Sequence, residues 1–160
     1  MGLGPSMKET TLHYYRDPML EVCSEDSDVN VMGVIIYGSA DENKFKLETA
    51  ARVGATAWGM RADGALLSCN GEGNNHVDYA QCIAELEKCG VTTVAMSMVP
   101  KEYFVTQNEY MTNNIVCYYK ATDHVGQIGD ETTYMCENNY DSIDVKKSLA
   151  LLKLRMRNKK

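Results

Sequence analysis

Apolar residues along the chain form short runs that alternate with amphipathic helical patterns. Val31–Tyr37 is an apolar run of strand length, whereas Glu42–Met60 places its apolar residues on one helical face. The predicted elements, in chain order, are extended pieces at Thr10–Tyr15 and Met19–Cys23, a strand at Val31–Tyr37, a helix at Glu42–Met60, a strand at Ala65–Cys69, a helix at Val77–Cys89, a strand at Val91–Met98, a helical turn at Glu109–Asn114, a strand at Ile115–Tyr119 and a helix at Ile143–Met156. This alternation predicts a parallel sheet. We expect an α/β fold, a Rossmann-like or flavodoxin-like three-layer sandwich with a mostly parallel sheet of four to five strands.

The chain has the size of one domain. Its 160 residues can bury a sizeable core, and no repeat or linker divides them. We expect residues 1–9 to be a flexible leader and residues 10–160 to form a single α/β domain. No apolar run approaches the roughly 20 residues that span a bilayer, and no secretory signal is visible. A cytoplasmic protein without a membrane partner is therefore expected.

Charge and cysteine content narrow the functional classes. The net charge of −6 argues against a nucleic-acid partner, because nucleic-acid binding requires a basic surface. The basic run Lys153–Lys160 ends the last helical pattern and is expected to stay solvated. The six cysteines show no CxxC pair and no zinc spacing, so we predict no metal site and a reduced intracellular protein. Four of them lie in or beside predicted core elements: Cys69, Cys82, Cys89 and Cys117.

Small and polar residues are concentrated where the strand Ala65–Cys69 ends and the helix Val77–Cys89 begins. Ligand sites of open parallel sheets lie at the carboxyl ends of the strands. The candidate ligand-binding residues are Cys69, Gly71, Gly73, Asn74, His76 and Asp78. If the loop binds a ligand, replacing Asn74 or Asp78 should weaken binding and leave the fold largely intact.

The same loop also allows a purely structural interpretation. It matches neither a complete G-x-G-x-x-G pattern nor a Walker A loop. Its glycines could expose amides to an anion or only form a turn, and Asp78 could only favour the first helical turn. His76 is either a general base or a surface residue. Cys69 is either an activated thiolate or a buried structural cysteine.

Several segments, in a fixed order, resemble one family. They are Ala50-Ala51-Arg52, Ala62-Asp63-Gly64-Ala65-Leu66-Leu67, Gly71-Glu72-Gly73-Asn74-Asn75-His76-Val77-Asp78, Glu87-Lys88-Cys89-Gly90-Val91-Thr92-Thr93-Val94 and Gly129-Asp130-Glu131-Thr132-Thr133. The chain thereby resembles the proprotein-derived substrate-binding subunits of the glycine, sarcosine, betaine and D-proline reductases, with the D-proline reductases favoured. The resemblance implies an oxidoreductase system that reductively cleaves the Cα–N bond of an amino acid. Electrons would come from a dithiol, with a selenocysteine on a partner subunit. It also implies a precursor that cleaves itself before a cysteine, which becomes a pyruvoyl group.

The chain departs from the catalytic members of this family. It begins with a Met leader, is shorter than the precursors and contains no selenocysteine. The candidate catalytic residues are Cys117 and Cys136, although a core role is favoured for Cys117. We expect an accessory subunit or paralogue for binding or assembly, with other reductase subunits including a selenoprotein, or an amino-acid ligand, as partners in an oligomer. Two alternatives stay open: a catalytic fragment with a pyruvoyl group formed at Cys117 or Cys136, and a generic Rossmann-like domain that binds a nucleotide or small ligand. No other cofactor is predicted.

Overall fold

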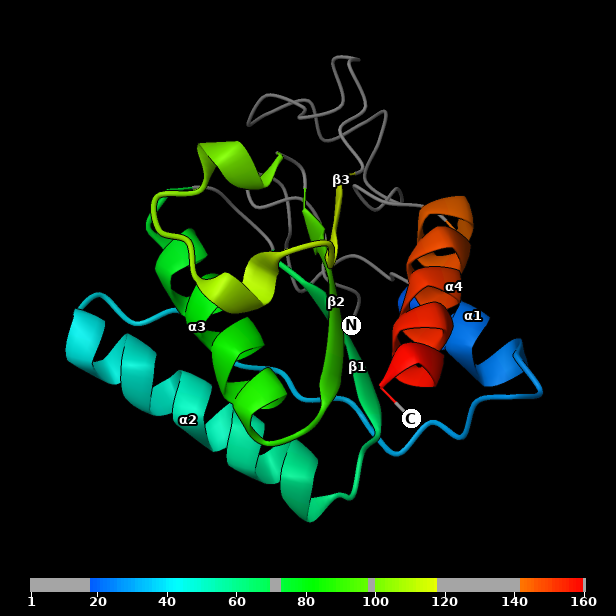
Figure 1. Cartoon of the computed structure of the whole chain (residues 1–160). Helices are drawn as coiled ribbons and strands as arrows, with labels where there is room; N and C mark the ends of the chain where they lie inside the picture. The colour runs from blue at the N-terminus through cyan, green and yellow to red at the C-terminus, as the bar shows by residue number, and fades with distance from the viewer. Residues whose placement is uncertain (1–17, 70–72, 98–99, 118–141, 160) are drawn as a thin grey trace, which may run out of the picture.

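The computed structural model describes residues 18–69, 73–97, 100–117 and 142–159 (Figure 1). The predicted leader 1–9, the extended piece Thr10–Tyr15, Gly71 and Cys136 lie outside these ranges. The described strands form one three-stranded sheet in the order β1-β2-β3, with both pairings parallel. These strands are β1 (Gly64–Ser68), β2 (Thr92–Ser97) and β3 (Ile115–Cys117). The central strand β2 is buried along its whole length.

Helices cover both faces of the sheet (Figure 1). On one face lie α2 (Asn43–Gly59) and α3 (Asn75–Lys88), and on the other lie α4 (Ser142–Asn158) and α1 (Pro18–Glu25). The first apolar core therefore joins α2 and α3 to the sheet, and the second joins α1 and α4 to it. Two 3-10 turns, η1 (Lys101–Tyr103) and η2 (Glu109–Met111), lie between β2 and β3.

The α/β class and most of the predicted elements are confirmed. The helices predicted at Glu42–Met60, Val77–Cys89 and Ile143–Met156 correspond to α2, α3 and α4, and three of the predicted strands correspond to β1, β2 and β3. The helical turn predicted at Glu109–Asn114 corresponds to η2. Gly90 follows the end of α3 with a φ of 85°, a left-handed conformation that glycine adopts at low cost.

The prediction that Met19–Cys23 is extended is wrong, because α1 spans these residues. Pro18 occupies the first helical position, where its missing N–H costs nothing. Met19, Val22 and Cys23 are spaced so that a helix places them on one face, and all three belong to the core against α4. Packing against α4 thus decides the conformation of this short segment.

The strand predicted at Val31–Tyr37 is not formed in the structure, which gives these residues no regular secondary structure. Ile35 and Tyr37 pack against the first core, whereas Met32, Val34 and Ile36 are 52%, 63% and 69% exposed. Only alternate side chains at the end of this apolar run therefore pack against the core, and these are partly buried. The described residues contain a sheet of three strands rather than the four to five that we predicted.

Several side chains lie elsewhere than their pattern predicted. In α2, Phe45 and Leu47 are exposed, and Lys46 is buried in their place. Cys69, Cys82 and Cys89 contact the first core as predicted, but Cys117 is exposed at the end of β3, so the core role predicted for it is wrong. A three-residue strand at the edge of the sheet is too short to cover this side chain.

The basic end of the chain is partly paired and partly solvated: Lys153, Arg155 and Lys159 form ion pairs, whereas Arg157 and Lys159 are exposed as predicted. The Lys153 ammonium lies 2.6 Å from an Asp26 carboxylate oxygen and 3.2 Å from one of Asp28. The Arg155 and Lys159 side chains both reach the Glu87 carboxylate, at 3.1 and 2.6 Å. Acidic residues of the same chain thus neutralise much of this basic end. Within the described ranges, no helix combines the length and apolar content that crossing a membrane requires.

Candidate functional site

The candidate loop connects the carboxyl end of β1 to the first turn of α3. Gly73 has a φ of 65°, which side chains of L-residues rarely adopt, and its carbonyl accepts a 3.0 Å hydrogen bond from the His76 N–H. Asn74 is exposed at the N-cap position and makes no side-chain capping bond among the described residues. The glycine therefore shapes the turn, and the Asn74 amide is left facing solvent.

Asp78 is at the centre of a buried ion pair. Its carboxylate oxygen Oδ2 lies 2.9 Å from the Lys46 ammonium, and the two side chains are only 3% and 0% exposed. Ser39, just before α2, donates its hydroxyl hydrogen to Asp78 and lies 2.6 Å from the Lys46 Nζ. Three elements of the fold therefore meet at Asp78, which already has an internal cation and an internal hydroxyl as partners.

The second carboxylate oxygen of Asp78, Oδ1, is buried and has no hydrogen-bond partner among the described residues. A buried acceptor without a partner costs about 1–3 kcal/mol. The Lys46 cation offsets this cost through the shared carboxylate. The position of Asp78 in the first turn of α3 adds a favourable interaction with the helix dipole.

Two thiols and a phenol lie beside this ion pair. Burial raises the pKa of Cys69 to about 12, with a further contribution from the Asp78 charge. Burial also raises the pKa of Cys82 to about 11, although a hydrogen bond from Tyr37 opposes the shift. The pKa of the Tyr37 hydroxyl is raised as well, first by its burial. These groups are therefore protonated at neutral pH, which supports the structural interpretation of Cys69 over the thiolate.

His76 is buried in the first turn of α3 rather than exposed on the loop. Its ring stacks on Phe104 with centroids 4.1 Å apart and planes 10° from parallel. One turn further, the Tyr79 hydroxyl lies 3.0 Å from the Leu67 carbonyl and 2.7 Å from the Met96 carbonyl, so it joins α3 to β1 and β2. The side chains of His76, Asp78 and Tyr79 thus fix the start of α3 against Phe104, α2 and the sheet.

Cys69 and Cys117, described members of the two candidate sets, lie at the same carboxyl edge of the sheet. Ser68 is paired with Met96 and Ser97 with Cys117, so Cys69 comes level with Cys117 across β2. Two strand spacings separate these residues, which is about 10 Å. The described residues contain no group of three His, Cys, Asp or Glu side chains that could hold a metal ion.

Sequence reasoning missed Lys46, Ser39 and Tyr37. A signal for Lys46 was available, because Lys46, Ala50, Val53 and Ala57 follow the spacing of one helical face and all four are buried. A lysine on an apolar face requires an acidic partner. No local pattern indicates that this partner is Asp78, which is 32 residues away.

A parallel α/β domain with polar loops at the carboxyl edge of its sheet belongs to a class that commonly holds small ligands at that edge. The chain belongs to the family of glycine/sarcosine/betaine reductase component B subunits, whose family model matches residues 3–143. It is 27% identical over 151 residues to the D-proline reductase proprotein PrdA of Acetoanaerobium sticklandii. This match covers 94% of the chain and 23% of the proprotein, so the chain spans about a quarter of that relative's length. No solved structure matches the chain.

The family resemblance drawn from the sequence is therefore confirmed. Two residues of its loop motif have structural roles. Gly73 shapes the turn that leads into α3, and Asp78, the last residue of the motif, forms the ion pair with Lys46. Glu87 and Thr93, in the following family segment, are hydrogen-bonded to each other. These residues, which belong to the family motifs, thus help to position α3 against α2 and the sheet.

Proposed function

We propose that this chain is a binding or assembly component of a D-proline-reductase-type system and does not itself perform the chemistry. Its partners would be other reductase subunits, including a selenoprotein, in the cytoplasm, or an amino-acid ligand at the carboxyl edge of a Rossmann-like or flavodoxin-like sheet. The supporting observation is that Asp78 and its neighbours are occupied by contacts within the chain. The Asp78 carboxylate is paired internally with Lys46, and the neighbouring thiols are protonated, so these groups do not supply a free nucleophile.

Among the described residues of the loop, Asn74 is the one best placed to contact a partner, since it is exposed while Asp78 and His76 are buried. We expect Asn74→Ala to weaken binding to purified reductase subunits by about tenfold, the effect of losing roughly 1.4 kcal/mol. Asn158→Ala, which removes an exposed amide at the end of α4, is the matched control. Equal binding by both variants would contradict a role for the loop, provided that their thermal stabilities match that of the parent chain.

A catalytic fragment is the alternative, and the exposure of Cys117 at the same edge of the sheet favours it. A pyruvoyl group formed at a cysteine would split the 17.9 kDa chain in two and leave a carbonyl that reacts with phenylhydrazine. Intact-mass measurement of the purified chain, with Cys117→Ala and Cys136→Ala as controls, separates the two functions. A single unreactive chain supports the binding component, whereas cleavage that one alanine variant abolishes would replace it by the catalytic fragment.

A further inference from the structure

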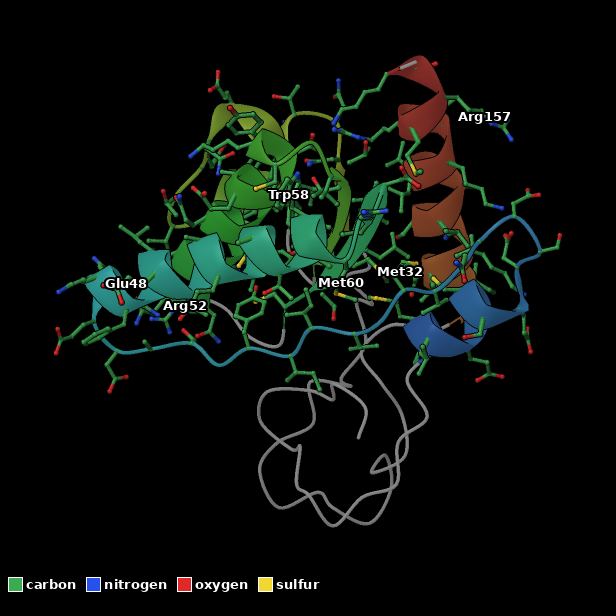
Figure 2. The ribbon with its side chains drawn as sticks, turned by 90° about the horizontal axis from the view of Figure 1, so that it is seen from below. Met32, Glu48, Arg52, Trp58, Met60 and Arg157 are labelled. Carbon is green, nitrogen blue, oxygen red and sulfur yellow. The ribbon has the colours of Figure 1, made fainter. Side chains whose placement is uncertain are left out.

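We propose that residues 31–37 form a self-association site, through which two copies of this chain pair as antiparallel strands centred on Val34. These residues form the 31–37 segment. They run from α1 towards α2 along the outside of the molecule, and Figure 2 shows this course beside α2. The proposal concerns the surface by which copies meet and holds whether or not the chain carries out chemistry.

The backbone of the 31–37 segment is available for pairing. Within the described ranges, none of its N–H or C=O groups takes part in a backbone hydrogen bond, and neither sheet pairing includes it. The composition is nevertheless typical of a strand, since it is rich in Val and Ile and contains a Tyr. An exposed strand-forming segment with unpaired backbone groups is a template for another strand.

The segment is held in place on one side and open on the other. Ile35 and Tyr37 pack into the first core. A side chain at Gly33 would come within 2.6 Å of the Met60 terminal methyl, so the segment passes close to the end of α2. At its other end, Ser39 reaches Lys46 near the start of α2. These contacts fix the segment along α2 and leave Met32, Val34 and Ile36 facing solvent.

The pattern of these three side chains favours a second copy as the partner. Met32 and Ile36 lie two residues on either side of Val34, so a two-fold axis at Val34 would place Val34 against its equivalent and Met32 against Ile36. Such self-complementarity is the requirement for a closed dimer interface. Cross-strand pairs of apolar side chains are also the main stabilising contacts of an antiparallel pair.

The charge of the segment itself permits the same partner. The chain carries a net charge of −6, so two copies repel each other overall, and contact is least opposed where charged side chains are absent. Residues 29–40 contain no charged side chain, and strand edges that stay unpaired are usually protected by charge or proline. The 31–37 segment has neither. Because a single strand pair buries less than the roughly 800 Å² per partner of a stable complex, we expect a weak, concentration-dependent dimer.

Sedimentation velocity of the full chain, from low micromolar to near-millimolar concentration, tests this site. The parent chain should shift from monomer to dimer. Val34→Lys should weaken the dimer by about tenfold or more, because two ammonium groups would meet at the two-fold axis. It should leave the circular dichroism spectrum and the thermal midpoint unchanged, since Val34 is exposed. Ile36→Lys, at a second exposed position of the segment, should act in the same direction.

Two control variants place the same charge on other exposed apolar residues. Trp58→Lys alters α2 and Val105→Lys alters the loop after η1, and each parent side chain is 65% exposed (Figure 2 labels Trp58). Both should retain the dimer. A monomer at every concentration would overturn the proposal. So would a dimer that Trp58→Lys or Val105→Lys disrupts while Val34→Lys does not.

Discussion

Lys46 and Asp78 form a buried ion pair, but the sequence suggests a different role for each residue. Asp78 stands in a glycine-rich loop motif and was predicted to bind a ligand, whereas Lys46 stands among the residues of an amphipathic helix. The structure joins them at 2.9 Å with almost no exposure. This contact changes the expectation for Asp78, since a residue that neutralises a buried cation cannot be replaced without an effect on the fold.

Lys46→Met should destabilise the protein by about 3–5 kcal/mol, because it leaves the Asp78 carboxylate buried without its cation. Asp78→Leu should act similarly on Lys46, and the double variant should recover most of the loss, since an apolar pair needs no compensation. Urea unfolding monitored by circular dichroism gives these free energies as a double-mutant cycle.

The control for this cycle is Arg52→Met, which breaks an exposed pair with Glu48 whose nearest atoms are 3.9 Å apart (Figure 2). Surface pairs of this kind contribute little, so unfolding of this variant should match that of the parent chain. Single variants at Lys46 and Asp78 that behave like Arg52→Met would show that the pair does not stabilise the fold.

Thiol reactivity should separate Cys117 from Cys69 and Cys82. At about pH 8, Cys117 should be alkylated early because its side chain is exposed. Cys69 and Cys82, with pKa values of about 12 and 11, should be labelled slowly because the thiolate is the reactive form. Peptide mass spectrometry after timed iodoacetamide treatment measures each site, and rapid labelling of Cys69 would restore it as a candidate nucleophile.

Among the helices and strands, local sequence patterns predicted the elements whose conformation depends mainly on their own residues. The amphipathic spacing of α2, α3 and α4 and the apolar run of β2 identified these elements within a few residues. The Met19–Cys23 and Val31–Tyr37 segments were mispredicted because their conformation depends on distant partners. The Met19–Cys23 segment is helical where its apolar side chains pack against α4. In the Val31–Tyr37 segment, only alternate side chains pack against the core.

The contact between α2 and α3 depends on a glycine. A Cβ at Gly54 would lie 3.0 Å from the backbone carbonyl carbon and oxygen of Glu85, and backbone cannot move aside as a flexible side chain can. Gly54→Ala should therefore destabilise the protein by about 1–3 kcal/mol through overpacking, although alanine favours the helix by roughly 1 kcal/mol.

Gly59, at the end of the same helix, is the matched position, since a Cβ there meets nothing within 4 Å. Gly59→Ala should be neutral or slightly stabilising. Chemical denaturation of both variants measures the difference, and a Gly54→Ala variant as stable as Gly59→Ala would show that α2 and α3 separate at little cost.

At the scale of the whole molecule, one carboxylate joins both sides of the sheet. Glu87, near the end of α3, accepts 2.7 Å hydrogen bonds from the Thr93 N–H and hydroxyl in β2. Arg155 in α4 and Lys159 just after its end approach it at 3.1 and 2.6 Å. The sequence pattern predicts only a solvated basic end for these cations, because no spacing indicates that residues about 70 positions apart meet at one side chain.

Acid should therefore weaken the connection between α3, β2 and α4. Burial by itself raises the pKa of Glu87, but the hydrogen bonds from Lys159 and Thr93 outweigh it, and the pKa falls below its ordinary value of 4.5. A carboxylate with a lowered pKa in the folded state stabilises the protein above its unfolded pKa. This stability is lost as the pH falls through the folded value.

Glu87→Gln should cost about 1–3 kcal/mol at neutral pH, because it weakens charge-assisted hydrogen bonds to a buried group. The difference in unfolding free energy between this variant and the parent chain should shrink as the pH is lowered from about 5 to about 3. Urea denaturation across this range measures it. Asp26→Asn is the comparison, because Asp26 also has a lowered pKa, from its hydrogen bond with Lys153, but links only the end of α1 to α4. If the Glu87→Gln difference stayed constant with pH, the stability of this junction would come from packing rather than from the ionised carboxylate.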